Sequence, residues 1–212
     1  MTTRTVAVVT AGLRKPSSTR LLADQLAAAT ENALRERGVE PQVDVVELRD
    51  HAQDLTNNML TGFPSPALRA IVDGVLVADG LIAVTPIFTA SYSGLFKTFF
   101  DALEDGSLAG KPVLLGATGG TERHSLAIDH AMRPLFAYLR ALVVPTGVYA
   151  APSDWGATAE GQQALSERIT RASEELADLI VKARPGDRRD EYDEPVPFEQ
   201  LLAGRAGDIS LP

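Results

Sequence analysis

The sequence predicts an α/β protein built on a doubly wound, five-stranded parallel sheet with helices on both faces. Three observations lead to this prediction. Short apolar runs alternate along the chain with longer segments whose apolar residues recur at helical spacing. Two of the runs, at residues 80–84 and 111–117, show no polar–apolar alternation, which is typical of strands buried on both faces. Both lead into polar loops, so we expect a ligand site at the carboxyl ends of the strands.

Composition narrows the possible functions. The 212 residues are 45% hydrophobic and carry a net charge of −8, and there is no cysteine. Disulfides, thiolate catalysis and cysteine metal sites are therefore excluded. An acidic chain without a basic stripe disfavours nucleic acid and anionic membranes as partners. Because there is no run of 18 apolar residues and no signal-peptide pattern, we expect a cytoplasmic protein.

The chain divides into a domain and a tail. Residues 1–184 hold all of the periodic segments, whereas residues 185–212 are proline-dotted and carry seven acidic residues and three arginines. The second segment alone contributes −4 to the net charge. We expect it to be an acidic C-terminal tail that is mobile or packed on another subunit.

The first quarter of the chain predicts two strands and a helix. Residues 5–10 are largely β-branched and predict the first, central strand. A helix follows the polar loop at 12–19 and ends near Gly38, a residue type that commonly follows a helix. Residues 42–48 alternate and predict a second strand nearer the edge of the sheet.

The middle of the chain predicts a loop, two helices and two strands. Residues 57–63 indicate a loop, after which Ser65 caps a new helix. The buried strand at 80–84 follows, and Ser91 begins a helix with a broad apolar stripe. Residues 111–117 then form the fourth strand of the prediction.

The last part of the domain predicts a disturbed helix, a strand and a final helix. Residues 122–141 read as a helix that contains Pro134, which cannot donate to the carbonyl oxygen of His130. We expect a kink or a π-bulge at His130. Residues 142–149 predict the fifth strand, and an amphipathic helix follows that ends near Arg184.

The loop after the first strand is a candidate anion site. Ser17, Ser18 and Thr19 stand at the N-terminus of a helix, and Arg14 and Lys15 come just before them. Exposed backbone N–H groups, hydroxyl donors and the positive end of the helix dipole suit a phosphate. The alternative is that one serine only caps the helix. The loop matches neither the Walker motif nor the Gly-x-Gly-x-x-Gly dinucleotide motif, which argues against a nucleoside triphosphatase or a classical dehydrogenase.

Two further strand ends carry candidate residues. The polar stretch at 85–97 follows the buried third strand, and Gly119 and Gly120 follow the fourth. Glycines at the end of a buried strand allow a planar ligand to approach the backbone, although a tight turn also needs glycine.

Three segments of the chain resemble the NADPH-dependent FMN reductases, the flavodoxin-like reductases of two-component monooxygenase systems. The resemblance covers about residues 4 to 180. It is carried by Pro16-Ser17-Ser18-Thr19-Arg20-Leu21-Leu22, by the stretch from Thr85 to Lys97, and by Ala117-Thr118-Gly119-Gly120-Thr121 with the residues up to Pro134.

The resemblance implies a role for each segment. It implies that Ser17 and Thr19, with neighbouring Ser18 and Arg14, hold the FMN phosphate, and that His130 lies where the family can carry a π-helix linked to subunit packing. Family members often have arginine where this chain has Ser18, so Arg14, Lys15 or Arg20 must supply the positive charge or the charge neutralisation is weaker. The isoalloxazine ring is expected between two groups: Pro86, Ile87, Phe88 and Ser91 on one side, and Thr118, Gly119 and Gly120 on the other.

The function expected from the resemblance is hydride transfer from NADPH to FMN, with the reduced FMN passed to a partner monooxygenase. The flavin carries that chemistry, so no catalytic side chain is predicted. A homodimer or homotetramer is expected. Two alternatives stay open: a quinone or azo-compound reductase that keeps FMN tightly bound, and a flavodoxin-like electron carrier that does not use NAD(P)H.

Overall fold

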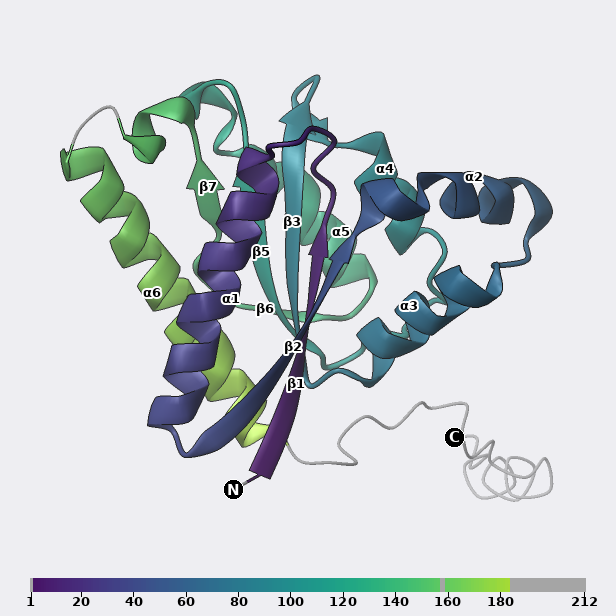
Figure 1. Ribbon diagram of the computed structural model, residues 1–212, viewed down its shortest axis with the longest axis horizontal. Coiled ribbons are helices and arrows are strands. Elements are labelled where there is room, and N and C mark those ends of the chain that lie inside the picture. Colours follow the sequence, from purple (N-terminus) through teal and green to yellow (C-terminus); the bar gives the residue numbers. More distant parts are fainter. Residues whose placement is uncertain (1, 157–158, 184–212) are drawn as a thin grey trace, which may run out of the picture.

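The computed structural model describes residues 2–156 and 159–183 and contains one mainly parallel sheet (Figure 1). Its main strands follow the order β2-β1-β3-β5-β6, while β7 also pairs with β5 and the short β4 pairs antiparallel with β3. The strands are β1 Thr2–Thr10, β2 Val39–Glu47, β3 Gly80–Phe88, β4 Ser91–Tyr92, β5 Pro112–Thr118, β6 Leu142–Val143 and β7 Val148–Ala150. The predicted doubly wound sheet is confirmed, with β1 inside it and β2 at its edge.

The predicted fifth strand is split into β6 and β7, which pair with successive parts of β5. Pro145 lies between them and lacks the N–H that a continuous ladder needs. Gly147 lies against Ile128, because a Cβ at Gly147 would come within 2.7 Å of the Ile128 Cγ2 atom. The backbone therefore packs closely against this neighbour between the two strand pieces.

Helices cover both faces of the sheet (Figure 1). One face is packed by α1 (Ser18–Glu36) and α6 (Ala159–Lys182), and the other by α3 (Pro66–Val77), α4 (Gly94–Phe100) and α5 (Arg133–Tyr138). Strand β3 explains the two layers: Ile82 and Val84 belong to the α1–α6 core, whereas Leu81 and Ala83 belong to the opposite core. The unbroken apolar run in this strand thus correctly indicated burial on both faces.

Two expectations for the middle of the chain are wrong. The expected loop at 57–63 is mostly helix, since α2 spans Ala52–Thr61 after a short 3₁₀ turn, η1, at Leu48–His51. Gly62 ends α2 with a φ of 75°, a left-handed conformation that glycine adopts easily. The helix expected from Ser91 begins at Gly94, because Ser91 and Tyr92 pair with β3 and the Ser93 side chain caps the helix.

The expected continuous helix at 122–141 is broken, and the predicted defect lies at its centre. The segment forms η2 (Glu122–His124), a π-helix η3 (Ile128–Met132) and α5. The N–H of Arg133 donates to the Ile128 carbonyl oxygen, five residues back, just before Pro134 removes a donor. The π-bulge expected around His130 is therefore confirmed.

The last helix of the domain ends close to the expected boundary with the tail. α6 ends at Lys182, close to the expected end of the helix near residue 184. The predicted tail, 185–212, lies outside the described residues, so the division of the chain at 184 stays a prediction. Within the part of the chain that the structure describes, no helix is long and apolar enough to cross a membrane.

Candidate functional site

The carboxyl ends of β1, β3 and β5 lie at the same edge of the sheet (Figure 1). The residues at these ends and in the loops that follow line a cavity of about 490 Å³. It contains ten of the eleven predicted site residues; Ser91 is not among the residues that line it. Sequence reasoning missed Leu13, Pro16 and Pro152. The first two lie within the predicted phosphate loop, but Pro152 follows β7 and had no signal of its own. The lining residues are Leu13, Arg14, Pro16, Ser17, Ser18, Thr19, Pro86, Ile87, Phe88, Thr118, Gly119, Gly120 and Pro152.

The β1–α1 loop brings a helix N-terminus to the cavity. Ser17 is the N-cap of α1, and its Oγ accepts a hydrogen bond from the Arg20 N–H at 3.2 Å. Ser17 therefore caps the helix and also lines the cavity. The cap uses its hydroxyl oxygen as an acceptor, which leaves the hydroxyl proton for a ligand. Gly12 lets the loop fold back onto Ser17, since a Cβ at Gly12 would lie 2.2 Å from the Ser17 Oγ.

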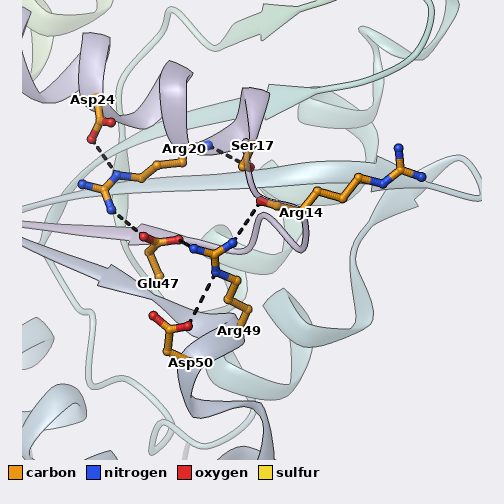
Figure 2. Close-up of polar contacts among 7 residues, drawn as sticks. All are labelled: Arg14, Ser17, Arg20, Asp24, Glu47, Arg49 and Asp50. Atoms are coloured by element: carbon orange, nitrogen blue, oxygen red, sulfur yellow. Dashed lines mark hydrogen bonds and ion pairs between the residues drawn. The ribbon is translucent and has the colours of Figure 1, made fainter.

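Arg14, Lys15 and Arg20, the three cations in the loop and the first turn of α1, differ in their availability. Arg20 is held between Asp24 and Glu47, at 2.7 Å from each carboxylate (Figure 2). The hydrogen bond to Asp24, helped by the charge of Glu47, raises the pKa of Arg20. Arg14 lines the cavity, its guanidinium points away from this network, and it makes no ion pair within the described residues. Lys15 is exposed and does not line the cavity. Arg14 is therefore the cation that the cavity offers to an anion.

The β3–β4 hairpin carries an aromatic side chain at the cavity. Phe88 is 47% exposed, although every other residue of β3 is buried. The two turn residues, Thr89 and Ala90, have φ values of 49° and 66°, as in the tight turns that join two antiparallel strands. At the base of the hairpin the Ser93 N–H donates to the Thr85 Oγ1 at 3.1 Å. The buried threonine thereby fixes the hairpin over the sheet.

The loop after β5 is tied to both neighbours of the cavity. The Thr118 and Thr19 hydroxyl oxygens lie 2.8 Å apart, and both side chains are buried. Gly119 faces Tyr149, whose hydroxyl would lie 1.9 Å from a Cβ at this glycine and donates to the Thr121 carbonyl oxygen at 2.7 Å. Burial, with smaller contributions from nearby carboxylates, raises the pKa of Tyr149 and keeps this donor protonated.

The family follows from comparison with known proteins. Residues 4–156 match the family model described as NADPH-dependent FMN reductase. The chain belongs to this family. An FMN reductase (NADPH) of Pseudomonas aeruginosa is 38% identical over 177 residues, which are 82% of this chain and 91% of that protein. The NADH-dependent FMN reductase SfnF of Pseudomonas putida is 39% identical over 166 residues, 78% of this chain and 87% of that protein.

A solved structure gives the same result for the fold. An oxidoreductase from Corynebacterium diphtheriae superimposes with a TM-score of 0.83 at 46% identity, covering 87% of this chain and all of that one. The predicted family, the flavodoxin-like fold and the class of enzyme are confirmed: this FMN reductase family member is an oxidoreductase that uses FMN and NAD(P)H.

The residues that line the cavity of this family member have the chemistry that FMN binding requires. A phosphomonoester needs donors and positive charge, which a helix N-terminus with Ser17 and the cavity-lining Arg14 offer. A flat ring system needs an apolar wall and a backbone without side chains. Phe88 supplies the apolar wall. Gly120 supplies backbone without a side chain, and no atom lies within 4 Å of the place that a Cβ would take there, so a ring has space to approach.

Proposed function

We propose that this protein transfers a hydride from NAD(P)H to FMN held in the β1–β3–β5 cavity and releases the reduced FMN to a separate monooxygenase. The observation that carries the proposal is the cavity, where an anion-binding helix N-terminus, an apolar hairpin and a glycine loop meet. The relative named SfnF is described as an NADH-dependent FMN reductase. For this chain, supplying a monooxygenase is the proposal that the resemblance motivates.

The protein's part in the reaction is binding and orientation. Bound flavin supplies the hydride-accepting chemistry. The Ser17, Ser18 and Thr19 segment with Arg14 would hold the phosphate. The backbone from Thr118 to Gly120 would lie along the ring edge, although the Gly119 N–H already donates to the Ala150 carbonyl oxygen at 3.1 Å. Pro86, Ile87 and Phe88 would give the ring an apolar wall from which water is excluded. Ser91, opposite Phe88 in the β3–β4 pairing, remains a predicted contact.

The charge distribution supports FMN as an exchangeable substrate. Arg20 is occupied by two carboxylates, so the described part of the loop presents one cavity-lining guanidinium to a phosphate that carries close to two negative charges. Incomplete neutralisation weakens anion binding, because charge-assisted hydrogen bonds are the strong contacts in such sites. A reductase that releases reduced FMN at each turnover needs such moderate affinity.

Kinetics with added flavin tests the proposal. Purified protein stripped of flavin is mixed anaerobically with NADPH or NADH and increasing FMN, and flavin bleaching is followed by stopped flow. We expect turnover that rises with FMN concentration and saturates, with many FMN molecules reduced per protein. Rapid reduction of a quinone at substoichiometric FMN would instead favour the tightly bound alternative. Absence of flavin bleaching with either nucleotide would leave an electron carrier.

Three finer points stay with this proposal. Relatives are named both NADPH-dependent and NADH-dependent, so the nucleotide preference is to be measured as kcat/KM for each. The homodimer or homotetramer is tested by light scattering after size exclusion, with and without FMN. The cytoplasmic location is tested by fractionation of cells that express the full chain.

A further inference from the structure

Arg49 ties the phosphate loop to the end of β2 without lining the cavity. It lies in η1, and its Nη1 donates to the main-chain carbonyl oxygen of Arg14 at 3.0 Å. Its Nη2 lies 2.6 Å from Glu47 Oε2, and its Nε lies 3.6 Å from Asp50 Oδ1. Figure 2 shows the guanidinium between these three groups. The Arg49 side chain is only 13% exposed, so the packing around it fixes its direction.

The same network reaches the other end of the loop. Glu47 binds Arg49 through one oxygen and Arg20 through the other, and Arg20 lies in the first turn of α1 (Figure 2). The loop is therefore held at Arg14 by Arg49 and at the start of α1 by Arg20. The Glu47 carboxylate contacts both arginines and so links these two attachment points.

The bond from Arg49 fastens the exposed part of the loop. Residues 13–16 are all exposed. Within the described part of the chain, the bond from Arg49 to the Arg14 carbonyl oxygen is the single hydrogen bond made by residues 12–16. A charged donor on a main-chain carbonyl is worth more than a neutral hydrogen bond. Without it, the Arg14 side chain would sample positions away from the cavity.

We infer that Arg49 is a positioning residue for phosphate recognition: it fixes the main chain of Arg14 so that the Arg14 guanidinium and the Ser17 hydroxyl face one anion. The inference rests on the proposed function, because the anion is taken to be the FMN phosphate. It differs from a simple charge effect, since Arg49 acts through the geometry of two simultaneous bonds. Lysine would keep the charge but not the planar fork that reaches both partners.

Comparison of FMN with riboflavin isolates this role, because riboflavin has the same ring and no phosphate. Dissociation constants of both flavins are measured by fluorescence quenching for the wild type, R49K, R49M, R14M and the R14M/R49M double variant. Arg35 provides the control: it forms an exposed pair with Glu31 at 3.0 Å on α1, and R35M should change neither constant. Thermal unfolding of each variant verifies folding.

The expected pattern is specific to positioning. R49M raises the FMN dissociation constant about tenfold and R49K at least about fivefold, while riboflavin changes less than about twofold. The double variant is weaker than R14M by much less than tenfold, because Arg49 acts through Arg14 and the two effects are not additive.

Other outcomes overturn the inference. R49K with wild-type FMN affinity would show that charge alone matters, and a multiplicative double variant would show that Arg49 does not act through Arg14. If R49M fails to fold, R49K and the R14M/R49K cycle decide. Equal affinity of the wild type for FMN and riboflavin would contradict the inference. The proposed reductase function would still hold if NAD(P)H reduces either flavin. Tight FMN binding without NAD(P)H oxidation refutes the proposed function alone.

Discussion

Replacing Gly119 by alanine tests the glycine loop most directly. The new Cβ would lie 1.9 Å from the Tyr149 hydroxyl and 3.0 Å from its ring carbon, so the tyrosine must move. Overpacking of this kind costs about 1–3 kcal/mol, and the hydrogen bond from Tyr149 to Thr121 contributes about another 1 kcal/mol that would be lost. We expect G119A to lower the free energy of unfolding by about 3 kcal/mol.

Thermal unfolding measures this cost. At about 2–4 °C per kcal/mol for a chain of this size, the Tm of G119A should fall by about 6–12 °C. G120A is the matched control, because no atom lies within 4 Å of a Cβ at Gly120. Adding Y149F to G119A removes the clashing oxygen and should recover part of the loss. A G119A protein with the Tm and FMN affinity of the wild type would refute the packing argument.

Three further predictions test the hairpin and one long-range ion pair. F88A should raise the FMN dissociation constant about tenfold in a fluorescence titration while changing the Tm little, because Phe88 is half-exposed but lines the cavity; unchanged affinity and turnover would remove the hairpin from the site. A90G should stabilise by about 1 kcal/mol in urea unfolding, since alanine is strained at a φ of 66°, and a lower stability would contradict the turn geometry. The hydrogen bond from Arg37 lowers the pKa of Asp178 in the folded state. The pair therefore stabilises the fold at pH values above the unfolded pKa near 3.8, and this stabilisation is lost as the pH falls through the lower pKa of the folded state. The Tm difference between wild type and D178N should therefore be present at neutral pH and vanish in acid; a difference that persists below the folded pKa would disprove the linkage.

Local sequence patterns determined much of this fold. The unbroken apolar run of β3 indicated a strand buried on both faces, because an interior parallel strand has no solvent side to accommodate polar residues. Pro134 indicated a kink or a π-bulge at His130, since a missing N–H donor is a property of one residue and needs no tertiary information, and the structure has the π-helix there. The loops at the ends of β1, β3 and β5 followed from the same reasoning, as parallel strands end at one edge.

Tertiary structure decided what local patterns could not. Ser91 was expected to start a helix, but pairing with Phe88 makes it a strand residue, and such a pairing depends on a partner rather than on its own neighbours. The choice among Arg14, Lys15 and Arg20 as the cavity cation was also open in the sequence. In the structure Asp24 and Glu47 occupy Arg20, Glu47 comes from strand β2, and Lys15 does not line the cavity. Sequence determined which residues could bind an anion, whereas long-range ion pairing determined which of them remains available to do so.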